Sequence, residues 1–452
     1  MPTLLLLFAC TGPKPSDEGD DTAPIASDFD VEVEVGEVQT VLVVRWTTEA
    51  PTAGTVTASF GGETLVRNEA ASAKNHTLTF VGVPAETEVA IRVDAIGEDG
   101  SQSVGEGSAV TGALPDWVPE LTLDIDDPEK SEGGYTLFTL ISDTGAAILG
   151  VDEQARVVWY WPSSETLLDM TPFRARESID GGAILYAYAA SDPDDYGEVV
   201  RVPLAGGEPA STPVPASHTD FVEYTEGGYV ALGWDVRAFG DRQILGDSLI
   251  EVAPDGTRRE VWNVFDWFEP DLSQTWPDFY GRMKGVEDWS HLNGMSYDPA
   301  TDTVLVSSTF NNAILEVDRA SGDLAATITD GDGSDYVARG VLMSLPHSVQ
   351  PIDGGLHVFS RNASDQCSQS MDVTLDDDAG TAQVTWSYED PDCIHIDYLG
   401  STLRLEGGNT LIGWSTSNRV DEVTADGELV WSASLDFGHA IGFLQHEVVI
   451  GE

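Results

Sequence analysis

The sequence contains few cysteines and few basic residues. Only 3 of the 452 residues are cysteine, and no Cys-x-x-Cys pair occurs, so the usual zinc-ligand spacing is absent. We therefore predict neither a metal site nor a cofactor. Lysine and arginine together number 21 against 78 acidic residues, a formal net charge of −57. This balance argues against nucleic acid and anionic membrane surfaces as partners.

The sequence begins with an apolar run that is too short to span a bilayer. Residues 1–10 end in Leu-Phe-Ala-Cys10, which resembles a bacterial lipoprotein signal whose cysteine carries the lipid. The start lacks a lysine or arginine, so an ordinary secretion signal or an incorrect gene start is the alternative. Residues 11–27 are rich in Pro, Ser, Asp and Gly, as in a disordered tether. We expect a lipid-anchored protein of the bacterial cell envelope, in the periplasm or outer membrane, with membrane contact through the lipid only.

The two remaining cysteines are Cys367 and Cys393. In an exported protein they would form a disulfide, with two free buried thiols as the alternative. The acidic loop between Asp330 and Asp335 has the alternating oxygen ligands of a calcium site. It lacks the rest of an EF-hand pattern, so an ordinary turn is favoured over calcium binding.

Residues 28–115 read as a separate unit of short alternating strands. Val41–Trp46 and Val89–Ile96 alternate apolar and polar residues. The pattern resembles a fibronectin type III β-sandwich, although Val89 stands where a tyrosine is usual. We interpret this unit as a spacer or docking module.

From residue 116 to residue 452 the sequence repeats. Copies of a Glu/Asp-Gly-Gly strand start, a Glu-Val strand and an Asp-Gly or Ser-Gly turn recur every 48 to 73 residues. Four short antiparallel strands per repeat are typical of propeller blades. We predict an all-β chain with a six-bladed β-propeller, in which the run at 448–450 completes an earlier blade and closes the ring. The repeats start near Met170, His218, His291, His347 and Ser401.

Three of these repeat starts are histidines. Equivalent positions of blades face one axis, so His218, His291 and His347 should converge there. Convergent imidazoles in a pocket suit nucleophilic and acid–base chemistry. The segment before the fourth blade is rich in aromatic residues. Some of them, Trp289 included, are candidates to stack on a substrate ring.

Two longer stretches begin at Asp288-Trp-Ser-His291-Leu-Asn293 and at Gly400-Ser-Thr-Leu-Arg404. In order and spacing they resemble the bacterial arylsulfotransferase family, the sulfate-ester-dependent type. The resemblance covers roughly 124–431. It implies a six-bladed propeller that moves a sulfuryl group from a phenolic sulfate ester to a phenolic acceptor. It also implies a covalent sulfo-histidine, without a nucleotide donor.

Within that resemblance, His347 matches the nucleophile, and His218 and His291 match two supporting histidines. Thr309 stands where the family has an arginine, and Ser348 where it has an aspartate. Arg361 lies at the equivalent register one blade later and could replace the missing guanidinium. Our candidate substrate-binding residues are Arg361, Asn293 and Trp289. An inactive propeller that only binds, and a hydrolase that releases the sulfuryl group to water, remain the alternatives.

Overall fold

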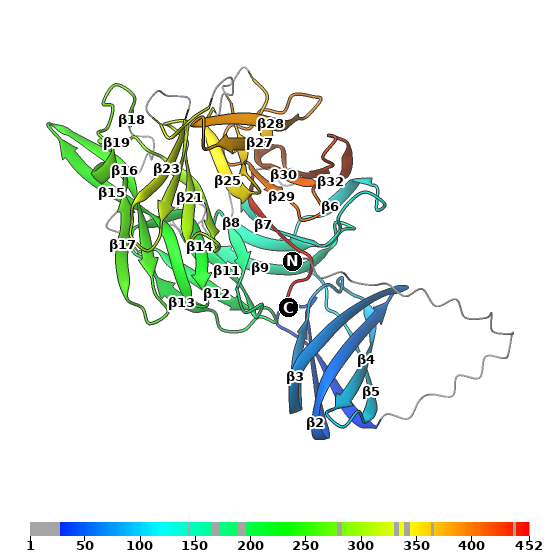
Figure 1. The fold of residues 1–452 in the computed structure, drawn as a ribbon. Helices are drawn as coiled ribbons and strands as arrows, with labels where there is room; N and C mark the ends of the chain where they lie inside the picture. The colour runs from blue at the N-terminus through cyan, green and yellow to red at the C-terminus, as the bar shows by residue number, and fades with distance from the viewer. Residues whose placement is uncertain are drawn as a thin grey trace.

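The computed structural model describes residues 28–142, 145–164, 172–188, 196–277, 283–329, 334–338, 344–362, 366–436 and 440–451. Strands dominate both of its bodies, and Figure 1 shows β2–β5 as a body apart from the larger array of blades. No helix among these residues is long and apolar enough to cross a membrane. Cys10 and the acidic positions 330–332 lie outside the described residues.

The N-terminal body is one strongly bent sheet. Its strands are β1 (Phe29–Val35), β2 (Leu42–Phe60), β3 (Glu63–Phe80), β4 (Glu88–Gly97) and β5 (Gln102–Val110). The order is β1-β5-β4-β2-β3, and β1 also pairs with the first half of β2, so the sheet folds over its own core. Trp46, Phe60 and Phe80 are buried there because alternate residues of each strand point inward. The fibronectin type III resemblance stays a prediction.

The larger body consists of blades, each a four-stranded antiparallel sheet with the innermost strand named first. Blade one is β33 (Ala440–Glu447), β7 (Tyr135–Ser142), β8 (Gly145–Val151) and β9 (Val157–Ser164). Blade two is β10 (Ala175–Glu177), β11 (Ala183–Tyr188), β12 (Glu198–Pro203) and β13 (Ala210–Pro213). Blade three is β14 (Ser217–Thr225), β15 (Gly228–Phe239), β16 (Arg242–Val252) and β17 (Arg258–Asn263).

The later half of the chain adds further sheets of the same kind. Blade four is β20 (Leu292–Asp298), β21 (Thr303–Ser308), β22 (Ala313–Asp318) and β23 (Leu324–Thr329). Blade five is β25 (Pro346–Ile352), β26 (Gly355–Ser360), β27 (Gln369–Asp376) and β28 (Thr381–Glu389). Blade six is β29 (Ser401–Arg404), β30 (Thr410–Trp414), β31 (Arg419–Val423) and β32 (Leu429–Leu435).

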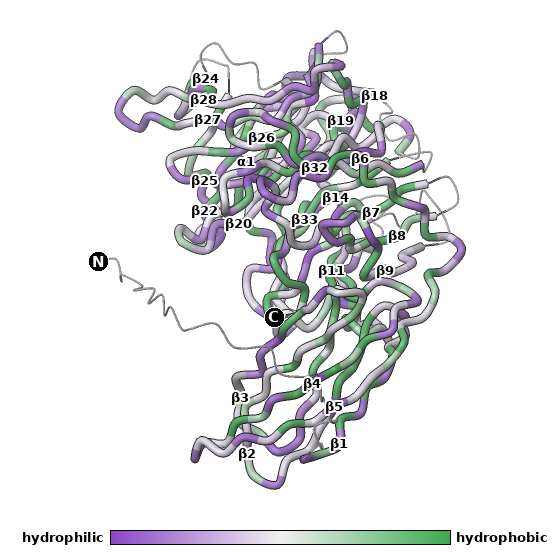
Figure 2. The backbone as a smooth tube through the Cα atoms, turned by 90° about the vertical axis from the view of Figure 1, so that its right-hand side faces the viewer, coloured by the Kyte–Doolittle hydropathy of each residue, from purple (hydrophilic) through white to green (hydrophobic). Residues whose placement is uncertain are grey.

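Short elements extend these blades. They are α1 (Val264–Trp267), β18 (Trp276–Pro277) and β19 (Val286–Asp288) beside blade three, β24 (Tyr336–Ala338) between blades four and five, and the 3-10 helix η1 (Ser415–Ser417) in blade six. The linker strand β6 (Leu121–Asp126) pairs with β32 as an outer fifth strand. Figure 2 shows hydrophobic segments along the strands of both bodies.

The innermost strands form a closed cycle. β33 and β10 are neighbours, as are β14 and β20, β20 and β25, β25 and β29, and β29 and β33, while β14 contacts blade two through β11. The prediction of an all-β propeller is therefore confirmed. One expectation was wrong: the closing strand is β33, not the run at 448–450, where Val448 is exposed. Ala440–Leu444 are buried instead, because they fill the inner edge of blade one beside β7.

Candidate active site

The three candidate histidines begin the inner strands of neighbouring blades. His218 lies in β14, His291 directly precedes β20, and His347 lies in β25. The backbones of β20 and β25 approach closely, since a Cβ built on Gly294 would lie 2.2 Å from the carbonyl oxygen of His347. Only glycine permits that approach. These strands bring the histidines to the same end of blades three, four and five.

His347 is buried and electrically neutral at neutral pH. Its Nδ1 lies 2.8 Å from the carbonyl oxygen of Gly400, which can only accept, so Nδ1 carries the proton. Nε2 then keeps its lone pair. Burial holds the pKa of His347 well below its usual value, and the nearby charges of Arg361 and His291 act in the same direction. The result is an imidazole with a nucleophilic nitrogen.

His291 is paired with a buried carboxylate. Its Nδ1 lies 2.6 Å from Oδ2 of Asp288, and its ring stacks on Phe310 with centroids 4.3 Å apart. The backbone of His291 has a φ of +45°, a left-handed conformation that non-glycine residues rarely adopt. Burial raises the pKa of Asp288, and the contact with His291 opposes that rise.

His218 faces its own carboxylate. Nε2 lies 2.9 Å from Oδ1 of Asp247, and Nδ1 lies 2.9 Å from the hydroxyl of Thr219. Burial alone would raise the pKa of Asp247, but the contact with His218 lowers it. Asp247 also accepts from Ser290 and from the backbone of Leu292, so it ties β16 to the turn that carries His291. This arrangement gives His218 a positioning part in the cluster.

Arg361 follows β26 and is 9% exposed. Its Nη1 donates to the carbonyl oxygen of Asp397 over 2.9 Å, and its Nε has no acceptor among the described residues. Burial lowers the pKa of Arg361 to about 10. The carboxylate of Asp397 attracts the guanidinium and so opposes the effect of burial on the pKa of Arg361, but no salt bridge joins the two side chains. A buried cation of this kind, acting on His347, favours an anionic ligand.

Thr309 and Ser348 have structural partners. The Thr309 hydroxyl donates to the carbonyl oxygen of Pro346 over 2.7 Å and accepts from the amide of Asn293. The hydroxyl of Ser348 accepts from the backbone of Thr402 over 3.1 Å. Thr309 therefore joins blades four and five, and Ser348 joins blades five and six. These positions hold inner strands together and carry no charge.

The structure places two predicted substrate residues inside the blades. The oxygen of the Asn293 amide accepts from Ser307 and its nitrogen donates to Thr309, so it serves the joint between strands. Trp289 is 4% exposed, stacks on Phe265, and lines a cavity of about 340 Å³ beside Val264 and Phe268. That cavity lies against α1 and blade four.

One residue of the aromatic-rich segment before the fourth blade lies near a candidate histidine. Trp276, half-exposed on β18, stacks on Phe310 with centroids 4.7 Å apart, and Phe310 stacks on His291. Trp262 is buried in the blade core. Phe279 and Tyr280 lie outside the described residues. Phe310 was not among the candidates, although it follows Thr309 directly.

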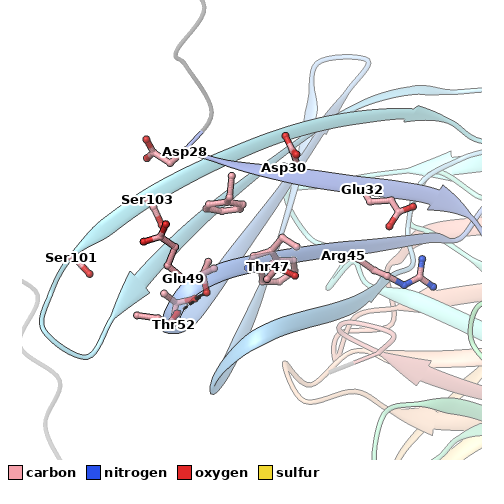
Figure 3. A pocket seen from close by; sticks show the side chains of 13 residues that line it. Asp28, Asp30, Glu32, Arg45, Thr47, Glu49, Thr52, Ser101 and Ser103 are labelled. Atoms are coloured by element: carbon pink, nitrogen blue, oxygen red, sulfur yellow. Dashed lines mark hydrogen bonds between the residues drawn. The ribbon is translucent and has the colours of Figure 1, made fainter.

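A larger cleft than the one beside Trp289 lies elsewhere. It has a volume of about 720 Å³ and opens between β1 and β2 of the N-terminal body (Figure 3). Carboxylates of Asp28, Asp30, Glu32 and Glu49 surround it. None of the three histidines lines it, so it takes no part in the site described above. Within the described ranges no group of three or more His, Cys, Asp or Glu side chains is arranged to hold a metal ion.

Cys367 and Cys393 form a disulfide with Cα atoms 4.8 Å apart, which confirms the pairing. We expected the two cysteines on adjacent strands, which was wrong. They lie in the loops that precede β27 and follow β28. Paired strands bring those loops together. Beside the disulfide, Ser368 donates to the carbonyl oxygen of Arg361 and accepts from the backbone of Ile396. The bridge therefore braces the loop that holds Arg361.

Two carboxylates of the site, Asp288 and Asp247, were not predicted. The sequence could have predicted Asp288, because it lies three residues before His291 in the motif that resembles the family. Asp247 lies in the third blade at a position that no local pattern marks. Its role depends on the pairing of β16 with the segment before β20.

The fold is a β-propeller in which histidines begin the inner strands of three neighbouring blades; His218 and His347 are buried and His291 is partly buried. Residues 124–343 match the family described as Arylsulfotransferase (ASST). This match supports the arylsulfotransferase family and an arylsulfotransferase-like function for the chain. The matched stretch contains His218 and His291 and ends before His347, so the role of His347 rests on its geometry.

Solved structures resemble the chain only distantly. A protein of unknown function from Bacteroides caccae is 13% identical with a TM-score of 0.41, covering 69% of this chain and 98% of that one. A streptogramin B lyase structure is 13% identical with a TM-score of 0.41, covering 74% and 100%. The β-propeller domain of Cps50 (Swd1) from Myceliophteria thermophila is 10% identical with a TM-score of 0.41, covering 72% and 92%. No curated protein matched the sequence.

Proposed function

We propose that this chain transfers a sulfuryl group between phenols through a sulfo-histidine on His347, without a nucleotide donor. The observation that carries the proposal is a buried neutral imidazole that feels the charge of a buried arginine, whose Nε has no hydrogen-bond acceptor among the described residues. The lone pair supplies the nucleophile. The guanidinium supplies charge for the sulfate oxygens.

In the first half-reaction, Nε2 of His347 attacks sulfur, and the S–N bond forms as the bond from sulfur to the phenolic oxygen breaks. The phenolic oxygen takes a proton from His291, whose positive charge Asp288 offsets at 2.6 Å. Arg361 binds the sulfate oxygens. The carbonyl of Gly400 accepts from Nδ1, which stays protonated on the cationic ring.

In the second half-reaction, an acceptor phenol returns a proton to His291 and attacks sulfur. The S–N bond breaks, and its electron pair restores the neutral imidazole of His347. Phe310 and Trp276 offer aromatic faces beside His291 for either phenolic ring. Water in place of the phenol would make the same chemistry a hydrolysis.

The test uses 4-nitrophenyl sulfate with and without added phenol. Release of nitrophenolate that phenol accelerates supports transfer, and release that phenol leaves unchanged indicates hydrolysis. Mass spectrometry at alkaline pH locates the covalent sulfuryl group. His347→Asn should abolish release and labelling, with His76→Asn, on β3 of the N-terminal body, as the matched control. A label on another residue would contradict the assignment.

A second candidate is a propeller that binds aryl sulfates without turning them over. The replacement of a charged family position by Thr309, which is fully buried and bonded to Pro346, favours it. Its signature is binding of 4-nitrophenyl sulfate without release or labelling. Arg361→Gln would then weaken binding alone.

We also propose that the chain acts in the bacterial cell envelope, anchored by a lipid on Cys10, with residues 28–115 as a spacer and 116–452 as the catalytic propeller. The disulfide supports an oxidising compartment. Labelled palmitate should enter the full-length protein in cells, and Cys10→Ser should prevent it. A protein that stays unlabelled and intracellular would contradict the anchor.

A further inference from the structure

The imidazole of His347 lies against an aromatic ring from the far end of the chain. Phe443 belongs to β33, which pairs with β7 (Figure 2), and is 1% exposed. Its ring and that of His347 have centroids 4.9 Å apart and planes 18° apart, so they stack. The phenyl ring covers one face of the imidazole and leaves the ring edge, with Nε2, uncovered by it.

A guanidinium holds the same phenyl ring. The central carbon of Arg174 lies 4.1 Å from the centroid of Phe443. The phenyl ring therefore makes two contacts, a cation–π contact with Arg174 and a ring stack with His347.

Arg174 is itself fixed. Its Nε and Nη2 donate to the two oxygens of Asp220, both over 2.9 Å, and its Nη1 donates to the carbonyl oxygen of Leu444 over 3.2 Å. Asp220 also accepts from the backbone of Met295 over 2.8 Å. Inner strands of blades one to four therefore meet at this bidentate pair, and Phe443 is held against a rigid partner.

One hydrogen bond alone does not orient His347. The bond from Nδ1 to Gly400 leaves the imidazole free to turn about that axis. A flat ring stacked on one face removes this freedom, because turning would drive the imidazole edge into the phenyl ring. Both constraints together fix the direction of the Nε2 lone pair.

We propose that Phe443 and Arg174 are positioning residues that set the plane of the His347 imidazole and shield it from water. The proposal rests on the proposed role of His347 as the nucleophile. Neither residue touches the reacting atoms, and both act through His347. The last strand of the propeller therefore contributes to the active site without contacting substrate.

The shielding has a measurable signature. Burial is the largest cause of the depressed pKa of His347, followed by Arg361, with His291 and Arg174 also acting in that direction and the Gly400 carbonyl opposing them. Removing the phenyl ring admits water and lessens the burial. The pKa of His347 should then rise toward its ordinary value.

The experiment compares Phe443→Leu with Phe443→Tyr, which keeps a flat ring, and with Phe138→Leu, a buried phenylalanine of β7 in the same blade. Histidine-selective labelling of the full chain gives the His347 pKa by NMR, with His347→Asn for assignment. We expect Phe443→Leu to raise that pKa and to lower kcat/KM about 10–100-fold. In the pH profile of kcat/KM, the fall on the acidic side should move to higher pH. Phe443→Tyr should restore both values, and Phe138→Leu should leave the pKa unchanged.

Arg174→Lys keeps the charge but not the planar guanidinium. It serves as a second, independent test if Phe443→Leu does not fold. It should move the His347 pKa in the same direction. An unchanged His347 pKa in both Phe443→Leu and Arg174→Lys would overturn the proposal. A shifted pKa in a protein that neither releases nitrophenolate nor takes up label would instead refute the proposed function and leave the positioning intact.

Discussion

Arg361 donates a hydrogen bond from Nη1 to the carbonyl oxygen of Asp397 over 2.9 Å. The contact spans a loop, since Asp397 lies between the disulfide at Cys393 and the Gly400 carbonyl that holds His347. One loop thus holds both His347, the proposed nucleophile, and Arg361. The arrangement places a guanidinium at the site from blade five, where the family position at 309 has none.

Removing the Arg361 charge should slow transfer strongly. Arg361→Gln should lower kcat/KM about 10²–10³-fold, because a preorganised donor to a developing anionic charge is lost. Arg361→Lys should recover only part, since it lacks the planar fork. Steady-state rates with 4-nitrophenyl sulfate check this, with Arg237→Gln on an exposed ion pair as the control. Equal rates for wild type and Arg361→Gln would assign the sulfate contact to another cation.

The carboxylate of Asp288 should matter to proton transfer but not to labelling. Asp288→Asn removes the charge that holds His291 at 2.6 Å, so turnover should fall about 10–100-fold while His347 still takes up the sulfuryl group. Rapid-quench labelling separates the two steps. Asp302→Asn, which breaks an ion pair with Arg319 on blade four, should behave as wild type. Loss of labelling in Asp288→Asn would mean that Asp288 acts on His347.

Stability should fall on mild acidification, in part through His347. Its pKa in the folded protein is well below 6.5, because burial disfavours the imidazolium. The unfolded chain therefore binds more protons below about pH 6.5. The contribution of His347 is complete above that value and is lost as the pH falls toward the folded pKa. In thermal melts from pH 7.5 to 5, the Tm of His347→Asn should rise relative to wild type as the pH falls. A constant difference would contradict this.

Reduction of the disulfide should affect activity as well as stability. Opening the bridge between Cys367 and Cys393, 26 residues apart, should cost about 3 kcal/mol of unfolding free energy. It should also loosen the loop that holds Arg361, so activity should drop under conditions where the protein is still folded. Urea titrations and rates with and without dithiothreitol test this. The Cys367→Ser, Cys393→Ser double variant should show no further response to the reductant.

The repeats were predictable because hairpin turns and strand alternation are local signals. The Asp-Gly and Ser-Gly turns at 255–256 and 321–322 fall between the paired strands of blades three and four, and His218, His291 and His347 each start an inner strand. Position within a blade follows from such a pattern. The side on which a neighbouring residue lies does not, which is why Asn293 and Trp289 were assigned to substrate.

Contacts between distant blades could not be predicted in the same way. Arg174 meets Leu444 across 270 positions, and β10, which follows it, has only three residues, too few to show a period. Phe443 sits in a strand that the sequence marks only as apolar, and the closing strand was placed several residues too late. These residues become visible as site residues only when the inner strands are assembled.

The pairing of β33 with β7 has a consequence for biosynthesis. Leu140 and Ile441 are partners, so the first blade to be started is the last to be completed, about 300 residues later. Until then β7 presents an open edge, which invites pairing with other chains. A ribosome that stops before residue 440 leaves that edge uncovered and His347 without its Phe443 partner. Completion of the proposed active site and protection of the β7 edge therefore depend on the same step, the addition of β33.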